Sequence, residues 1–150
     1  LIKTLNWYNS EPRTIITLEI HKEENKMKIK YGVSLKNLKI QMRYVMMEAD
    51  RIWNEYGKEC VVTSGTEVVN PDYNYTTQQE DRPLIHSVGS LHHFGYALDL
   101  RNHYFSDVDK IRVLSKLQKS LNEISTQYRC ILEQTHIHVE WRGHIGIGQK

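Results

Sequence analysis

The chain lacks several features that define whole classes of protein. Its 150 residues include two cysteines, Cys60 and Cys130, which are too few for a disulfide framework and have no metal-ligand spacing to each other. Each lies in an apolar run, so we expect buried free thiols. No apolar run approaches the ~20 residues that span a bilayer, and the start LIKTLNWYNS lacks the basic and apolar segments of a secretory signal. We therefore expect no membrane insertion.

A strong excess of charge of either sign is also lacking. Twenty basic and eighteen acidic residues give a net charge of +2, and the basic residues are scattered. Without a dense basic patch interleaved with aromatic residues, we expect no nucleic-acid partner. The hydrophobic content of 39% and the charged content of 25% are ordinary for a globular protein. At this length we expect one compact domain, residues 1–150, and the sequence does not indicate its oligomeric state.

Hydrophobic periodicity predicts an α+β domain with a central, mostly antiparallel sheet and two main helices. Strands are predicted at residues 14–20, 27–31, 60–63, 96–101, 129–132 and 136–141. Helices are predicted at residues 38–56 and from Ser106, which with Asp109 resembles a capping box, to about residue 124. The second helix is expected to bury Ile111, Leu114, Leu117 and Leu121. Residues 66–89 show no clear period, and a loop of this length is usually functional.

The fourth and the last predicted strands each have one apolar and one polar face. Because side chains alternate along a strand, Asp99 shares its face with Ala97, whose small side chain leaves space. In the last strand, His138 shares its face with His136 and Glu140. If the two strands are neighbours, Asp99 and His138 can meet on this polar face.

A third candidate ligand, His92, lies just before the fourth predicted strand, and Gly95 allows the chain to bend so that the imidazole reaches the same place. Two neutral imidazoles and one carboxylate suit zinc, with water as the fourth ligand. Zinc lowers the pKa of such a water from ~15.7 toward ~7 and polarises a carbonyl oxygen. We therefore expect zinc as the cofactor and amide hydrolysis as the reaction class.

Two motifs carry a resemblance to a known family. Residues 90–100, SLHHFGYALDL, are preceded by His86-Ser87 and followed by THIHVEW at residues 135–141. Together they resemble the family that joins zinc D-alanyl-D-alanine carboxypeptidases, phage L-alanyl-D-glutamate endopeptidases and the Hedgehog signalling domain. Its pattern is Ser-x-His-x-x-Gly-x-Ala-x-Asp, followed by a late histidine that is often in His-x-His. The resemblance covers roughly residues 31–142 and implies a Hedgehog/DD-peptidase-like fold.

By position, the resemblance implies the zinc ligands His92, Asp99 and His138. His136 then matches a helper histidine that polarises the substrate or stabilises the oxyanion. A second register stays open, because Glu133-x-x-His136 also fits dipeptidase members and would make His136 the ligand. Glu133 lies near the position of the family's catalytic carboxylate, the general base that takes a proton from water and returns it to the leaving amine. On an unbroken strand Glu133 would face away from His136, so a bend at residues 134–135 is required.

Further residues are expected to support the site from outside the ligand set. His86 matches a Hedgehog histidine near the metal. Ser90 is expected to bond the backbone or Asp99 and to shape the loop. Glu140 lies on the polar face beyond the last ligand, where it can orient a histidine.

One departure from the family concerns an arginine. Many peptidase members carry it shortly after the Ser-Gly that closes the strand, where it grips a carboxylate or carbonyl of the substrate. This chain has no arginine at residues 63–67. Arg82 or Arg101 could replace it as a charge clamp. A strict carboxypeptidase is therefore not favoured.

The resemblance implies a zinc metallopeptidase that hydrolyses an amide bond in bacterial cell-wall peptide, with zinc-bound water as the nucleophile. Phage lysins belong to this class, and such a protein acts at the cell wall with peptidoglycan peptide as its partner. The D-Ala-D-Ala and L-Ala-D-Glu bonds are both open as the scissile bond. The alternative is a non-catalytic zinc-containing binding domain of the Hedgehog type, which the missing arginine favours. A third hypothesis is a polar core without metal.

Overall fold

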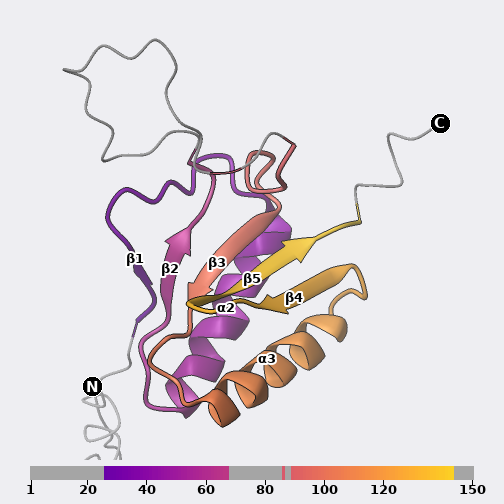
Figure 1. Ribbon diagram of the computed structural model, residues 1–150. Helices are drawn as coiled ribbons and strands as arrows, with labels where there is room; N and C mark the ends of the chain where they lie inside the picture. The colour runs from indigo at the N-terminus through magenta and orange to yellow at the C-terminus, as the bar shows by residue number, and fades with distance from the viewer. Residues whose placement is uncertain (1–25, 68–85, 87–88, 144–150) are drawn as a thin grey trace, which may run out of the picture.

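Five strands and two helices make up the described part of the chain (Figure 1). The computed structural model describes residues 26–67, 86 and 89–143. The strands are β1 (Lys28–Ile29), β2 (Val61–Ser64), β3 (Ala97–Arg101), β4 (Tyr128–Leu132) and β5 (His136–Trp141). The helices are α2 (Ile40–Glu55) and α3 (Asp107–Asn122). All five strands belong to one sheet, in the order β1-β2-β3-β5-β4.

The sheet is mixed, with one parallel pair. β1 and β2 are parallel, whereas the pairs β2–β3, β3–β5 and β5–β4 are antiparallel. The prediction of an α+β fold with a mostly antiparallel sheet and two main helices is therefore confirmed. β3 lies at the centre of the sheet with β5 beside it, so the two strands that carry the polar motifs are direct neighbours.

Both helices pack against the same face of the sheet, the helix face. In Figure 1, α2 lies behind the sheet and α3 runs alongside β4. α2 buries Met42, Val45, Ala49, Ile52 and Trp53, and α3 buries Val113, Leu117 and Leu121. These side chains form one core with Leu98, Leu100, Ile137 and Val139 of the two central strands. Removal of this apolar surface from water, worth roughly 25 cal/mol per Å², is the main source of stability.

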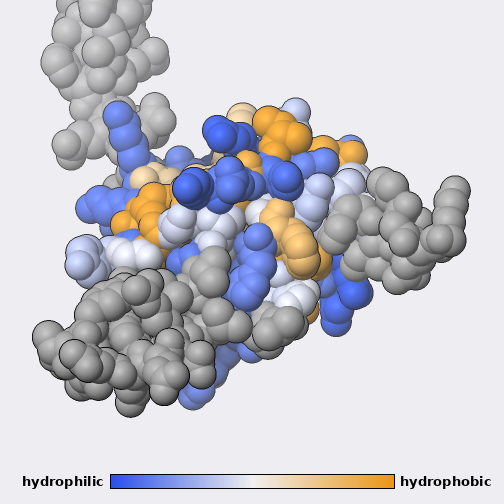
Figure 2. Space-filling model, turned by 90° about the horizontal axis from the view of Figure 1, so that it is seen from above, coloured by the Kyte–Doolittle hydropathy of each residue, from blue (hydrophilic) through white to orange (hydrophobic). Residues whose placement is uncertain are grey.

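The opposite face of the sheet, the site face, is covered by neither of the described helices. Along β3 and β5 it carries Asp99, His138 and Glu140, each one position away from a core residue. Figure 2 shows the molecule from the upper end of Figure 1, and there hydrophobic side chains form separate small patches among hydrophilic ones. The alternation along the central strands thus divides the sheet into an apolar and a polar side.

α3 begins where the sequence predicts and buries Leu117 and Leu121 as predicted, but its buried stripe includes Val113 in place of Ile111. Ser106 is the N-cap, and its hydroxyl accepts a hydrogen bond from the backbone N–H of Asp109 at 3.2 Å. The buried stripe starts at Val113, whereas Ile111 is 60% exposed. The prediction that Ile111 faces inward is wrong, because Ile111 lies about 200° from Val113 around a helix of ~3.6 residues per turn. Leu114 is partly buried at the border of the stripe.

β4 is an edge strand, and one side chain of α3 covers part of its free edge. The backbone N–H of Cys130 donates to Gln118 Oε1 at 2.8 Å, and Gln118 Nε2 donates to the carbonyl of Tyr128 at 3.1 Å. Open backbone groups at a sheet edge invite pairing with other chains. The Gln118 amide takes the place of a neighbouring strand here and ties α3 to β4.

The remaining predictions concern the two thiols and two segments that lie wholly or mostly outside the described residues. Cys60 is a buried free thiol as expected, whereas Cys130 is half-buried. Burial raises the pKa of Cys130 to about 12. The predicted strand at residues 14–20 and most of the loop at 66–89 lie outside the described residues. Neither α2 nor α3 is long and apolar enough to cross a membrane.

Candidate metal centre

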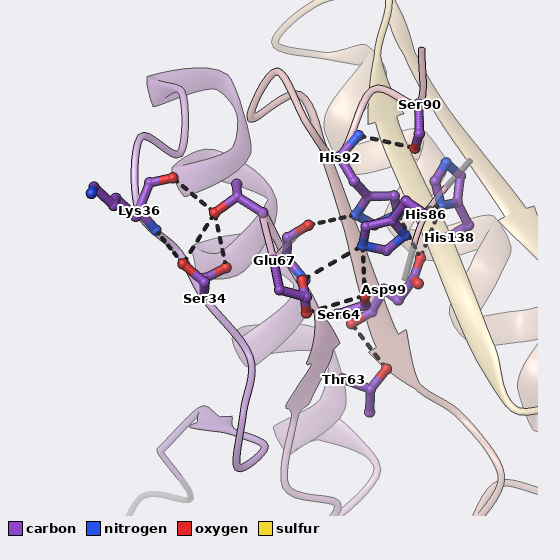
Figure 3. Close-up of polar contacts among 12 residues, drawn as sticks. Ser34, Lys36, Thr63, Ser64, Glu67, His86, Ser90, His92, Asp99 and His138 are labelled. Atoms are coloured by element: carbon purple, nitrogen blue, oxygen red, sulfur yellow. Dashed lines mark hydrogen bonds and ion pairs between the residues drawn. The ribbon is translucent and has the colours of Figure 1, made fainter. Parts of the chain in front are cut away.

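Three side chains from separate segments bring one ligand atom each to the same point on the site face (Figure 3). His138 Nδ1 lies 2.9 Å from Asp99 Oδ1, and His92 Nε2 lies 3.4 Å from the same oxygen. The two ring nitrogens are 3.3 Å apart. Metal–ligand bonds of ~2.0–2.2 Å allow ligand atoms around one ion to lie up to about 4.4 Å apart. The cluster could therefore hold a metal ion.

The register of β3 and β5 produces this convergence. Asp99 pairs directly with His138, and side chains directly opposite each other in an antiparallel pair have Cβ atoms ~4.5–5.5 Å apart on one face. His92 comes from the turn before β3, which ends at Gly95 with φ +79°. A Cβ at Gly95 would lie 2.4 Å from the carbonyl oxygen of Asn37. Glycine is therefore required at this bend, which returns His92 to the polar end of β3.

The outer ring nitrogen of each histidine has a hydrogen-bond acceptor. His92 Nδ1 donates to the carbonyl of Gly65 at 2.8 Å, and His138 Nε2 donates to Glu140 Oε2 at 3.1 Å. These bonds leave His92 Nε2 and His138 Nδ1 beside Asp99. Histidines that ligate metals almost always donate their other N–H in this way, which fixes the tautomer and the ring orientation. Glu140 thus makes the contact with a histidine that its place on the polar face predicts.

The carbonyl that holds His92 belongs to a tightly packed turn at the end of β2. A Cβ at Gly65 would lie 2.2 Å from the carbonyl oxygen of Ser34, so the two backbones approach closely. The Gly65 N–H donates to both oxygens of Glu67, at 3.0 and 2.7 Å. Glu67 is 8% exposed. Sequence reasoning missed Glu67, and the available signal was a carboxylate directly after a buried strand and a Ser-Gly turn.

His86 lies directly against His92 (Figure 3). The two rings are stacked, with centroids 3.9 Å apart and planes 2° apart. His86 Nε2 lies 3.1 Å from the hydroxyl of Ser64 and 3.5 Å from Glu67 Oε2. Burial and then the neighbouring His92 lower the pKa of His86, which favours a neutral ring. His86 therefore supports the site by packing against the ring of a candidate ligand.

The charges within the cluster are strongly coupled. Burial acts to raise the pKa of Asp99, but hydrogen bonds from His138 and His92 outweigh it and hold that pKa well below its usual range. Burial likewise acts to lower the pKa of His138, but the hydrogen bonds to Asp99 and Glu140 produce a net increase. Both ring nitrogens of His138 therefore lie within hydrogen-bond distance of a carboxylate, Nδ1 at 2.9 Å from Asp99 Oδ1 and Nε2 at 3.1 Å from Glu140 Oε2. Because a metal ion binds a deprotonated ring nitrogen, its affinity at this site should depend on pH.

His136 lies at the border of the cluster. Its Nε2 is 3.7 Å from Asp99 Oδ1, and its Nδ1 is 3.2 Å from the hydroxyl of Thr135. The converging group contains His138 and not His136. Of the two registers that the sequence leaves open, the geometry favours the one with His138 as a ligand and His136 beside it.

Glu133 lies in the turn between β4 and β5. Its backbone N–H donates to the carbonyl of His136 at 2.9 Å, so the chain reverses at residues 134–135, where a bend was required. Its carbonyl accepts a hydrogen bond from Asn102 Nδ2 at 3.0 Å. The Glu133 residue is exposed. The structure therefore places its backbone opposite that of His136, and its role as a base stays a prediction.

The other predicted residues divide between loop and strand. Ser90 Oγ accepts a hydrogen bond from the backbone N–H of His92 at 3.3 Å, which is one of the two contacts expected of it. Arg82 lies outside the described residues. Arg101 pairs with His136 across β3 and β5, at the end of the site face nearer the β4–β5 turn.

Two arginines that the sequence analysis did not single out contact Glu140. Arg142 Nε lies 3.2 Å from Glu140 Oε1, and Arg129 Nη1 lies 3.7 Å from the same oxygen. Arg129 pairs with Glu140 across β4 and β5. No motif in the sequence signals this contact, because it depends on β4 lying beside β5.

No protein-family model, curated protein or solved structure matches this chain. The family resemblance therefore depends on sequence motifs, chiefly those at residues 86–101 and 135–141. What the fold adds is the position of the side chains, which brings the predicted ligands of both motifs to one place.

Proposed function

We propose that this protein is a zinc-dependent peptidase that hydrolyses an amide bond in bacterial cell-wall peptide. The observation that carries the proposal is the convergence of two imidazoles and one carboxylate, with the outer N–H of each imidazole already bonded to an oxygen. This arrangement supports a metal centre, and the resemblance of the motifs supports peptidoglycan peptide as the substrate. A Hedgehog/DD-peptidase-like fold is part of the same proposal.

The donor set supports zinc over other common ions. Two nitrogens and one carboxylate oxygen suit zinc, whereas calcium and magnesium prefer shells of oxygen. Three protein ligands are also the number typical of catalytic zinc sites. When bound, zinc would supply a Lewis acid that activates a water molecule and polarises the scissile carbonyl.

His136 and Glu133 are the proposed catalytic residues. His136 is half-buried at the border of the cluster, with Nε2 close to Asp99 Oδ1. It can donate a hydrogen bond to the carbonyl oxygen of the substrate as negative charge develops there. Glu133 is exposed in the adjacent turn, and it would act as the base that takes a proton from water and passes it to the leaving amine.

The second candidate function is a zinc-containing binding domain without turnover. One observation favours it: His136 Nε2 lies 3.7 Å from Asp99 Oδ1, so a third imidazole is close to the ligand group. Four protein ligands make a closed, structural site. In such a domain His136 would complete the coordination sphere instead of assisting catalysis.

The first experiment measures zinc in the purified protein and the release of new amino groups from purified peptidoglycan. We expect one zinc ion per chain and a release that a chelator abolishes and added zinc restores. His138→Ala should remove both zinc and activity. His103→Ala changes an exposed histidine and should affect neither. Activity that survives complete removal of zinc would contradict the proposal.

Two further variants separate the peptidase from the binding domain. In a peptidase, Glu133→Gln retains zinc and loses about 10²–10⁴-fold in rate, the usual contribution of a general base. His136→Ala then also lowers the rate and leaves zinc affinity nearly unchanged. In a binding domain, His136→Ala weakens zinc binding and neither form hydrolyses peptide.

A further inference from the structure

The carboxylate of Glu140 is shared between a candidate metal ligand and two arginines. Its Oε2 accepts from His138 Nε2 at 3.1 Å. Its Oε1 faces Arg142 Nε at 3.2 Å and Arg129 Nη1 at 3.7 Å. The Glu140 side chain is 12% exposed, whereas those of Arg142 and Arg129 are 48% and 56% exposed. The buried carboxylate thus draws two largely exposed guanidinium groups to one point.

The charges at this point do not balance. One carboxylate neutralises one guanidinium, so the group of Glu140, Arg129 and Arg142 keeps one positive charge. The carboxylate of the neighbouring cluster, Asp99, is engaged by His138 and His92. A divalent ion at the cluster would add to the excess. A site with surplus positive charge attracts anions and raises their local concentration.

The two arginines also retain hydrogen-bond donors. A guanidinium carries five N–H donors in a planar fork, and within the described part of the chain the contact with Glu140 involves one nitrogen of each arginine. The remaining donors suit a second carboxylate, which arginine binds through two parallel hydrogen bonds. Lysine at these positions would keep the charge but lose the fork.

The location of the pair links it to the metal centre. Arg129 pairs with Glu140 across β4 and β5, so its side chain leaves the sheet on the site face. One carboxylate and one imidazole separate the guanidinium of Arg142 from His138 Nδ1, the candidate ligand atom. An anionic group bound by the arginines therefore lies beside whatever is held at the cluster.

We propose that Arg129 and Arg142 form a carboxylate-binding site that holds a free carboxylate of the peptide beside the metal centre. The proposal rests on the proposed function and narrows its substrate class to peptides with a free carboxylate near the scissile bond. The pair would bind the carboxylate in place of the family's arginine, which residues 63–67 lack. Residues 63–67 lie at the end of β2, on one side of β3, whereas β4 and β5 lie on the other side.

The test measures the binding of three synthetic peptides to the zinc-loaded Glu133→Gln protein by calorimetry. The first is a cell-wall stem pentapeptide that ends in D-Ala-D-Ala. The second and third are identical except that the C-terminal carboxylate or the D-Glu carboxylate is a carboxamide. We expect one of the two amides to bind at least ~10-fold more weakly, as the loss of a charge-assisted hydrogen-bond pair implies. Equal affinities for all three peptides would overturn the proposal.

Variants of the arginines complete the test. In the double variant Arg129→Gln/Arg142→Gln, the parent peptide should bind as weakly as the amide that binds weakly to the protein with both arginines. In the double variant Arg129→Lys/Arg142→Lys, the preference for the parent peptide over that amide should be only partly retained. Arg112→Gln, on the exposed side of α3 with an ion pair to Asp109 at 3.5 Å, is the matched control and should keep the preference.

The zinc content of the double variant distinguishes substrate binding from a purely structural role. We expect it to stay at one ion per chain. If zinc is lost together with the peptide, the arginines act only by holding Glu140, and the proposal is wrong. A preference that survives in the double variant also overturns it. The wild-type protein could instead prefer the peptide with the free carboxylate and yet cleave no peptide. This result would support the carboxylate-binding site and contradict the proposed peptidase function.

Discussion

The two faces of the sheet are built from the same strands but follow different physical rules. β3 contributes Leu98 and Leu100 to the helix face, both fully buried, and Asp99 between them to the site face. On the helix face, contacts are apolar, and the hydrophobic effect is non-directional. Their contribution to stability therefore depends on the apolar area buried and not on the orientation of the groups. On the site face, Asp99, His92 and His138 each have specific polar partners, because an unpaired buried polar group is costly.

This difference separates stability from function along a single strand. A substitution on the helix face should change the free energy of unfolding. It should affect metal binding only through the loss of the folded state. A change on the site face should alter metal binding while the core stays intact. Four predictions test this separation, beginning with the largest effect.

Trp53→Ala should destabilise the protein most. The Trp53 side chain is fully buried under the helix face, and its Nε1 donates to the carbonyl of Arg101 at 3.0 Å. Truncation of a buried tryptophan to alanine costs about 3–5 kcal/mol in the free energy of unfolding, measurable by urea denaturation. Met47→Ala on the exposed side of α2 is the control and should cost less than ~0.5 kcal/mol. A loss below about 1 kcal/mol for Trp53→Ala would contradict the core as described.

Zinc should stabilise the wild-type protein through the site face. A ligand at about 100 times its dissociation constant that binds only the folded state adds about 2.7 kcal/mol to the free energy of unfolding. Asp99→Asn removes the central carboxylate of the cluster and should abolish this increase. Urea denaturation with and without zinc measures it, and an equal increase in Asp99→Asn would show that zinc binds elsewhere.

Glu140→Gln should weaken zinc binding by about 10–100-fold, the usual effect of losing an outer partner of a ligand histidine. The amide keeps the shape of the side chain but cannot offer His138 the same charged acceptor. Competition with a chromogenic chelator measures the affinity. Glu123→Gln, at the exposed end of α3, is the control for loss of a negative charge. Unchanged affinity in Glu140→Gln would mean that His138 does not bind metal through Nδ1.

Ser106→Ala should have the smallest effect of the four and affect only the fold. The hydroxyl caps α3 by accepting from the Asp109 N–H, and loss of such a cap costs about 1 kcal/mol in the free energy of unfolding. Zinc affinity should not change, because α3 packs on the helix face. A change in zinc affinity of ~10-fold or more would show that the two faces are coupled.

What the sequence predicts well is the local geometry of each strand. Alternation has a period of two, so the shared face of His138 and Glu140 follows from their spacing alone. The meeting of Asp99 with His138 required one further condition, that β3 and β5 be neighbours, and the sheet order meets it. Helix positions are likewise predicted to within about two residues, although Ile111 faces outward.

What the sequence does not predict depends on contacts between distant segments. Arg129 meets Glu140 because β4 lies beside β5 in one particular register. Glu67 becomes part of the centre's support because the turn at Gly65 fits against Ser34, which is far away in sequence. Neither contact leaves a periodic pattern. Such partners are set by packing, and a motif search finds the ligands but not the residues that hold them.

The most direct measurement of the central claim is mass analysis of the products from a defined cell-wall pentapeptide incubated with the protein. With one zinc ion per chain, the account predicts cleavage at a single amide bond, no cleavage after chelation, and none by Asp99→Asn. A pentapeptide that stays intact with the zinc-loaded protein, or one that is cut equally well without metal, would contradict it.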